Sequence, residues 1–195
     1  MANFESQLEQ IYASDRDSWR NWLAEHYQIS NGIWLVYYKV KSGKPSIKYS
    51  EAVKEALCFG WIDSKVNSLD EECYKQIFTP RKPKSVWSKL NKQYIEELIE
   101  QGLMTAAGLA KIEAAKLDGS WTALDEIERL IVPQDLQQAL DQNEIAKRNF
   151  EAFSRSKKKN ILAWIGSAKR VETRMKRIEG AVLAAQENRN PLVRS

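Results

Sequence analysis

The sequence has little of the residue types on which metal sites and redox pairs are commonly built. It has one histidine, His26, so a metal site made of several histidines is excluded. Its two cysteines, Cys58 and Cys73, lie among apolar and strand-forming neighbours, and we expect reduced, packed thiols rather than a disulfide. The short motifs of a nucleophile elbow, a P-loop and a dinucleotide-binding loop are all missing. The sequence therefore indicates neither a cofactor nor a set of catalytic residues.

Long apolar runs are missing as well. No run approaches the roughly 18 residues needed to span a bilayer, and the first residues lack the basic and apolar regions of a secretory signal. We therefore expect a cytoplasmic protein without a transmembrane segment. What the chain does have is 43% hydrophobic residues, which is enough for a packed core in one large domain or two small ones.

The charge is mildly positive overall and unevenly distributed. The formal net charge is +4, but residues 145–195 carry 13 Lys or Arg against 4 Asp or Glu, whereas residues 1–39 carry 3 against 5. A basic C-terminal half suits an anionic partner, but a solvated helix face has the same pattern, and we favour the solvated face. Because helix-turn-helix, RNA-recognition and zinc motifs are missing, the sequence does not favour nucleic-acid binding.

Strand and helix patterns alternate in the first half of the chain. Ile33 to Val40 has apolar side chains on both faces, which predicts a central strand covered on both sides. The segments 61–69 and 73–80 are joined by three acidic residues and predict a hairpin. The expected elements are, in order, a helix over 4–27, a strand over 33–40, a helix over 51–59 capped by Ser50, and the two hairpin strands.

After Pro83 only helical patterns remain. Helices are expected over 85–101, 106–116, 133–142, 145–153 and 156–186, and the pattern leaves open whether the last is one helix or two. The predicted fold is therefore α+β, with a small, mostly antiparallel sheet flanked by helices and followed by a C-terminal helical region. We place the domain boundary between residues 83 and 84. The resulting domains, 1–83 and 84–195, pack either separately or as one unit.

The segment that joins the hairpin to the next helix is the clearest candidate for a binding site. Residues 80–92 contain two prolines and no acid, and their cations are Arg81, Lys82, Lys84, Lys89 and Lys92. Ser85 and Ser88 stand at the expected start of a helix, where free N–H groups and the helix dipole attract anions. Trp87 offers a flat face for stacking. We therefore predict an anion-preferring site at this segment.

Three residues outside this segment complete the predicted site. Asp63 lies in a predicted strand beside Trp61, and a carboxylate within a sheet must be paired, exposed or perturbed. Lys39, at the end of the first strand, is its candidate partner. The predicted ligand-binding residues are Lys39, Trp61, Asp63, Arg81, Lys84, Ser85, Trp87 and Ser88. In this hypothesis the cations bind anionic groups, the two indoles stack, and the carboxylate orients a cation or hydroxyl.

Two other classes of function fit the same residues. An enzyme acting on a small anionic substrate would use Asp63 as a base, with Lys39 or Arg81 stabilising charge. A metal carrier would gather carboxylates, for which the acidic residues in 70–72 and 96–100 are the candidates. We favour a binding protein whose partner is a small anionic ligand or another protein.

Several longer strings of residues resemble one family. They are GIWLVYYKV, YSEAVKEALCFGWIDSKV and QIFTPRKPKSVWSKLN, followed by GLMTAAGLAKIEAAKLDGSW, VPQDLQQAL and IGSAKRVETRMKRIEGAV. Through them the chain is similar to the YdeI/OmpD-associated (bacteriocin-protection) family over most of its length. The resemblance implies an N-terminal α+β domain of the YjbR/CyaY-like (frataxin-like) type, a helical C-terminal region, and a bacterial protein of stress or bacteriocin tolerance. It implies no catalytic residues, and its link to iron binding is distant.

Overall fold

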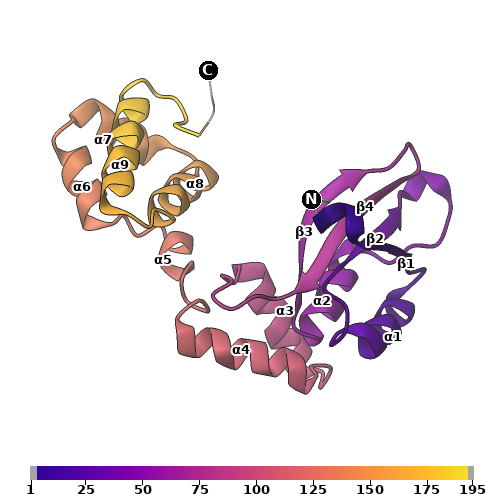
Figure 1. Ribbon diagram of the computed structural model, residues 1–195. Coiled ribbons are helices and arrows are strands. Elements are labelled where there is room, and N and C mark those ends of the chain that lie inside the picture. The colour runs from indigo at the N-terminus through magenta and orange to yellow at the C-terminus, as the bar shows by residue number, and fades with distance from the viewer. Residues whose placement is uncertain (1–3, 193–195) are drawn as a thin grey trace. The chain divides into compact units, whose positions relative to one another are not determined.

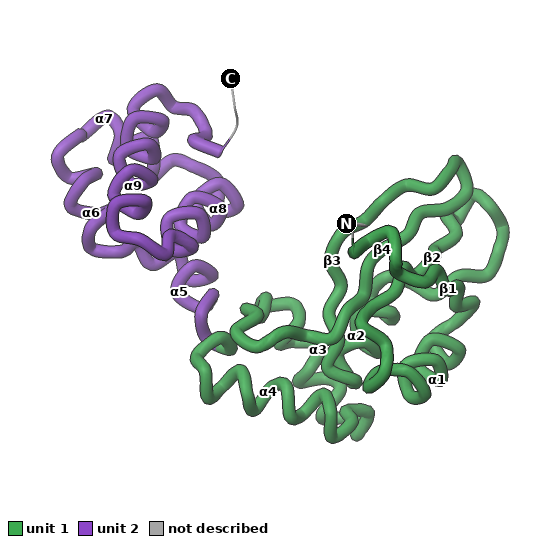
Figure 2. Tube along the Cα trace, in the orientation of Figure 1, with its two compact units in different colours: residues 1–121 green, residues 122–195 purple. Residues whose placement is uncertain are grey.

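The computed structural model describes residues 4–192, and the chain divides into two compact units over residues 1–121 and 122–195 (Figure 2). Unit 1 holds a four-stranded sheet with helices, and unit 2 is helical (Figure 1). The predicted α+β fold with a helical C-terminal region is therefore confirmed. The predicted boundary between residues 83 and 84 stays a prediction. The helices that follow it, α3 (Lys89–Glu100) and α4 (Ala106–Asp118), are part of unit 1.

Unit 1 begins differently from the sequence-based expectation. Its elements before α3 are η1 (Phe4–Gln7), β1 (Glu9–Tyr12), α1 (Arg16–His26), β2 (Ile33–Tyr38), η2 (Val40–Ser42), α2 (Tyr49–Cys58), β3 (Trp61–Ser68) and β4 (Cys73–Pro80). The helix predicted over 4–27 is therefore wrong before residue 16. Pairing of β1 with β2 outweighs the local helical pattern there. Helix α1 starts after Asp15, whose carboxylate accepts from the Ser18 N–H at 2.8 Å.

The strands form a sheet in the order β1-β2-β4-β3. β1 runs parallel to β2, and the other neighbouring pairs are antiparallel. β2 is thus internal, as predicted, and the predicted hairpin is confirmed as β3 and β4. Ile33, Leu35 and Tyr37 of β2 lie in the core with residues of α1 and α2, so these helices cover one face of the sheet (Figure 1).

A buried carboxylate joins the two helices that cover the sheet. Glu55 in α2 is fully buried, and its side chain pairs with Arg16 and, at 2.6 Å, with Arg20, both from α1. Arg20 also donates to the main-chain oxygen of Leu103 at 2.9 Å. Because a buried charge is tolerated only when it is paired and hydrogen-bonded, this network fixes α1 against α2.

The two helices after the hairpin start at polar caps. The Ser88 hydroxyl accepts from the Asn91 N–H at 3.1 Å, so α3 begins later than the predicted residue 85 and leaves 81–88 as a connector. α4 begins after Thr105, as predicted. The N–H and hydroxyl of Thr105 also donate to the main-chain oxygen of Cys58, at 3.2 and 2.6 Å. The start of α4 is therefore attached to the end of α2.

Unit 2 packs its helices around an apolar core of its own. The helices are α5 (Asp125–Glu128), α6 (Gln134–Asp141), α7 (Glu144–Ala152), α8 (Arg155–Gly166) and α9 (Val171–Gln186). The segment 156–186 is thus resolved into two helices. Fully buried core side chains come from four of these helices and include Leu136, Ala146, Ile161, Ile165 and Ala185. None of the helices described is both long and apolar enough to cross a membrane.

Candidate functional site

The connector between β4 and α3 is held in place by main-chain hydrogen bonds. The N–H of Arg81 donates to the Gly60 oxygen at 2.9 Å, which continues the pairing at the end of the β3–β4 hairpin. Lys84 adopts a left-handed conformation with φ of 60°, and its N–H donates to the Asp118 carboxylate at 3.0 Å. Such a backbone costs energy for any residue with a Cβ. The connector therefore has a fixed path against α4 rather than that of a loose loop.

Arg81 is the central side chain of this connector. It is only 3% exposed, and its Cζ lies 3.5 Å from the centroid of the Trp87 ring, in a cation–π stack. Its Nη1 donates to the Ser85 hydroxyl at 3.1 Å and to the Val86 oxygen at 3.0 Å. Its Nε and Nη2 are buried and have no hydrogen-bond partner among the described residues. Two nitrogens of a buried cation, which carry three N–H groups, thus lack a partner among these residues.

The environment of Arg81 disfavours its charge. Burial lowers the pKa of Arg81 to about 10, and the negative charge of Asp63 acts in the opposite direction. The guanidinium is therefore protonated at neutral pH. A buried charge that meets only neutral oxygens and a ring is costly.

A small cavity of about 60 Å³ lies beside Arg81. The connector and α4 form its walls, and the lining residues are Arg81, Lys82, Pro83, Lys84, Ser85, Trp87, Lys111, Ala114, Ala115, Asp118 and Ser120. The indole N–H of Trp87 is buried and has no hydrogen-bond partner among the described residues. Asp118 is occupied by main-chain N–H groups, those of Lys84 at 3.0 Å and of Ser120 at 2.9 Å. The residues that line the cavity thus include four cationic side chains and one occupied carboxylate.

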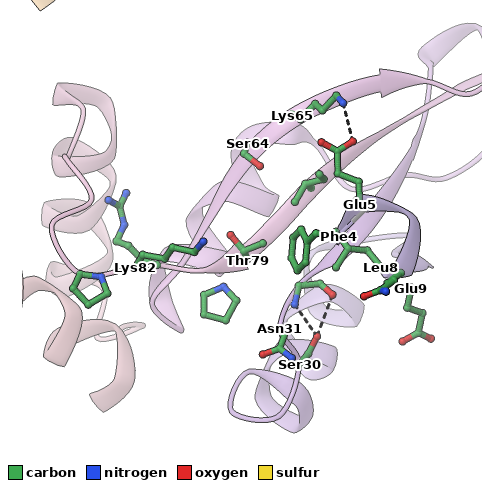
Figure 3. Close-up of a pocket in the computed structure, with 16 residues that line it drawn as sticks. Phe4, Glu5, Leu8, Glu9, Ser30, Asn31, Ser64, Lys65, Thr79 and Lys82 are labelled. Atoms are coloured by element: carbon green, nitrogen blue, oxygen red, sulfur yellow. Dashed lines mark hydrogen bonds and ion pairs between the residues drawn. The ribbon is translucent and has the colours of Figure 1, made fainter. Parts of the chain in front are cut away.

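A larger groove of about 900 Å³ lies on the face of the sheet turned away from α1 and α2 (Figure 3). Ile77 and Thr79 of β4 line it, and they alternate with Phe78, which belongs to the core on the other face. The remaining lining comes from residues 4–5, 7–9, 30–32, 64–65 and 80–83. The groove and the small cavity share Arg81, Lys82 and Pro83.

The structure brings four of the eight predicted site residues together. Arg81, Lys84, Ser85 and Trp87 all line the small cavity. Ser88 caps α3 instead, with its hydroxyl accepting from the Asn91 N–H. These residues are neighbours in sequence, which is why their proximity was predictable.

The other three predicted residues lie elsewhere in unit 1 and line neither cavity. Lys39 donates from Nζ to the main-chain oxygens of Asp70 and Glu71, at 3.0 and 3.3 Å, and so supports the β3–β4 turn. Trp61 is a core residue on the helix-covered face, where its indole N–H donates to the Tyr27 oxygen at 3.2 Å. The predicted pairing of Lys39 with Asp63 is therefore not observed.

Asp63 is satisfied by neutral donors. Its carboxylate accepts from the Tyr49 hydroxyl at 3.0 Å and from the Gln76 amide at 2.7 Å. Burial, with the charge of Asp63 next, raises the pKa of Tyr49 to about 12. The tyrosine therefore remains protonated and donating at neutral pH. Two donors on Asp63 make it a structural acceptor on the helix side of the sheet.

Sequence reasoning missed the residues that α4 contributes. Lys111 and Asp118 reach the small cavity because α4 packs on the end of α2, at a glycine. Gly108 lies so near α2 that a Cβ built there would be 2.3 Å from the Cys58 oxygen. A glycine inside an otherwise good helix was the available signal for this close approach. Among residues 4–192, no group of three or more His, Cys, Asp or Glu side chains is placed to hold a metal ion.

Two family models match different parts of the chain. The model described as a domain of unknown function, DUF8412, matches residues 11–111, which is more than half of the 195 residues. The chain belongs to the DUF8412 family. The DUF8412 region includes the second half of β1, the other three strands, the connector and the first part of α4, and therefore Arg81, Trp87 and Lys111.

The second model covers most of unit 2. Residues 129–188 match the family described as bacteriocin-protection, YdeI or OmpD-associated, which confirms the predicted resemblance for this part of the chain. The YjbR/CyaY-like character predicted for the N-terminal part stays a prediction, because DUF8412 is the model that matches there. No curated protein and no solved structure matches the chain.

Proposed function

We propose that unit 1 binds an oxyanion at Arg81 and that the chain acts as a binding protein in bacteriocin or stress tolerance. One observation carries the first part: Arg81 is 3% exposed, and its Nε and Nη2 have no partner among the described residues. Buried polar groups are hydrogen-bonded in the great majority of cases. An anion accepting from both nitrogens would satisfy them and neutralise the charge.

The size and charge of the small cavity support the same proposal. A buried water needs roughly 10–15 Å³ of such space, so a cavity of about 60 Å³ has room for a tetrahedral oxyanion. Lys82, Lys84 and Lys111 line it together with Arg81. Planar Arg–oxyanion pairs are among the strongest hydrogen bonds in proteins.

The biological part of the proposal rests on the family of unit 2. The match over residues 129–188 bears the description of bacteriocin protection, and this description supports a tolerance role for the chain. A bacterial, cytoplasmic protein suits the two free, buried thiols of Cys58 and Cys73. We keep the YjbR/CyaY-like relationship of unit 1 as part of this proposal, because its α+β composition agrees with it.

A thermal-shift and calorimetric titration with inorganic phosphate and sulfate, at constant ionic strength, tests the oxyanion site. Ligand that binds only the folded state raises the unfolding temperature, and the rise grows with the logarithm of the ligand concentration once this exceeds Kd. We expect a rise for the unaltered chain and none for Arg81→Met. The Met variant removes the charge and keeps an apolar side chain of similar length, so it should fold.

Lys41→Ala is the matched control, because Lys41 is an exposed cation of unit 1 that lines neither cavity. It should leave the phosphate-induced rise unchanged. If Arg81→Met and the unaltered chain show the same rise, or if neither anion produces one, Arg81 is not an anion site.

A further inference from the structure

Resting on the proposed oxyanion site, we infer that the groove on the open face of the sheet holds the rest of the same ligand, and that this ligand is a nucleoside monophosphate. The juxtaposition behind this inference is a phosphate-sized cavity and a ligand-sized groove that share Arg81, Lys82 and Pro83. Pockets for small organic ligands commonly measure about 300–1,000 Å³. The groove, at about 900 Å³, falls within that range.

The groove is electrically polarised along its length. Lys65 pairs with Glu5 at 2.7 Å along one edge of the groove, so these two charges cancel (Figure 3). Lys82 and Glu9, which line the groove, lie at opposite ends of it in Figure 3. An anionic head would therefore bind at the Arg81–Lys82 end. A neutral group that donates hydrogen bonds would lie at the Glu9 end.

An exposed aromatic ring lies between these ends. Phe4 is 51% exposed although it lines the groove, and Figure 3 shows its ring beside Thr79 and Leu8. Ile77 adds a second apolar side chain from β4. An aromatic face that remains half open to solvent is a platform on which a flat base can stack, and such stacking stabilises binding whichever base is present.

Unused polar groups surround this platform. The Ser64 and Thr79 hydroxyls and the Asn31 amide line the groove and make no hydrogen bond with other described residues. Hydroxyls suit the oxygens of a sugar, and a side-chain amide can both donate to and accept from the edge of a base. The groove thus has features that match the three parts of a nucleotide. The cationic end matches the phosphate, the hydroxyls match the sugar, and the aromatic platform with its amide matches the base.

The donor set favours phosphate over carboxylate as the head group. Arg81 Nε and Nη2 and the Trp87 indole nitrogen are three buried donor atoms without partners among the described residues. Two donors saturate the usual bidentate pairing of a carboxylate, whereas a phosphate presents three oxygens and about two negative charges at neutral pH. The lysines at the cavity suit that higher charge.

Isothermal titration with four ligand types tests the inference: the four common ribonucleoside 5′-monophosphates, the corresponding nucleosides, ribose 5-phosphate and inorganic phosphate. For the unaltered chain we expect at least one monophosphate to bind about tenfold or more tightly than inorganic phosphate. Phe4→Ala should remove most of that gain and leave inorganic phosphate binding unchanged. Arg81→Met should abolish binding of both. Leu117→Ala removes another exposed apolar side chain, 90% exposed and outside the groove, and should change neither.

The outcomes separate this inference from the proposed function. If inorganic phosphate binds through Arg81 but no monophosphate binds more tightly, or if the gain survives Phe4→Ala, the nucleotide inference is wrong and the oxyanion site stands. A nucleoside that binds as tightly as its monophosphate also overturns the inference. If no phosphate-containing ligand binds in an Arg81-dependent way, both the inference and the proposed function are wrong.

Discussion

Arg81 and Glu55 are both buried charged residues, but their surroundings differ. Glu55 meets two arginines of α1, so its charge is compensated within the protein. Arg81 meets the neutral oxygens of Ser85 and Val86 and the ring of Trp87, and its Nε and Nη2 have no partner among the described residues. Paired buried charges are typical of structural networks, whereas the unpaired charge of Arg81 is the observation from which we propose an oxyanion site.

A second ion pair makes a pH-dependent contribution to unit 2. Arg174 binds Asp135 through two nitrogens, at 2.6 and 2.9 Å, and this hydrogen bonding lowers the pKa of Asp135 below its ordinary value of 3.8. The stabilisation is therefore present above pH 3.8 and is lost as the pH falls through the pKa of the folded state. We expect Asp135→Asn to lower the free energy of unfolding by about 1 kcal/mol or less at pH 7.

Denaturant titrations at pH 7 and near pH 2.5 would measure this difference, which should shrink at the lower pH. Glu113→Gln is the control, because Glu113 belongs to an exposed pair with Lys116 in unit 1 and should contribute little at either pH. A difference for Asp135→Asn that is equal at both pH values would show that the ion pair is not its source.

Some individual residues of the candidate site could be predicted from the sequence, and others could not. Arg81, Lys84, Ser85 and Trp87 could be grouped because a short proline-bracketed segment keeps them close. Trp61 was assigned to the same hollow, but strand alternation places it on the helix-covered face, and the sequence alone does not say which face is covered. Lys111 was not predicted, because it lies on α4 and the sequence does not show which element α4 packs against.

Helix packing at Gly108 determines the position of α4. A glycine within a helix costs about 1 kcal/mol relative to alanine, and here it allows α4 to approach the Cys58 oxygen. We expect Gly108→Ala to lower the free energy of unfolding by about 2 kcal/mol, because the clash outweighs the better helix propensity. Thermal and denaturant unfolding would measure the change.

Gly180→Ala is the matched control in α9. A Cβ there would be 3.7 Å from the nearest atom of Trp164, an ordinary contact. This variant should raise the free energy of unfolding by about 0.5–1 kcal/mol through helix propensity alone. If Gly108→Ala were stabilising to the same degree, the close approach of α4 and α2 would not exist.

Helices and strands with a clear hydrophobic period could be predicted from the sequence, whereas the shortest ones could not. β2 and the β3–β4 hairpin followed from apolar alternation and an acidic turn. β1 spans four residues and α5 also spans four, too few for a period to emerge. The parallel pairing of β1 with β2, across the intervening α1, is a tertiary contact that no local pattern encodes.

The two units have separate apolar cores. The core of unit 1 draws its buried residues from positions 13–115 and that of unit 2 from positions 136–185. Each core is large enough to unfold cooperatively by itself. We therefore expect two transitions in differential scanning calorimetry of the whole chain.

The two glycine variants assign these transitions. Gly108→Ala should lower the temperature of one, and Gly180→Ala should raise the temperature of the other. A single transition that both variants move would show that the cores unfold together. Phosphate should raise only the transition that responds to Gly108→Ala, because Arg81 belongs to unit 1.

The extent of unit 1 could not be predicted from composition. Strand patterns end near residue 80, and this change suggested a boundary at 83 and 84. Yet α3 and α4 contribute Ile95, Leu98 and Ile112 to the core beneath the sheet. A change in secondary structure along a chain therefore need not coincide with a change of core.

The short β1 strand has a consequence for the behaviour of the chain in solution. β2 consists of Ile-Trp-Leu-Val-Tyr-Tyr, and β1 occupies the hydrogen-bonding edge that β4 leaves open. Proteolytic removal of residues 1–12 would expose a six-residue apolar strand with unsatisfied main-chain groups, which is a template for strand exchange and aggregation. The four residues of β1 thus protect this edge of β2 against self-association of the chain.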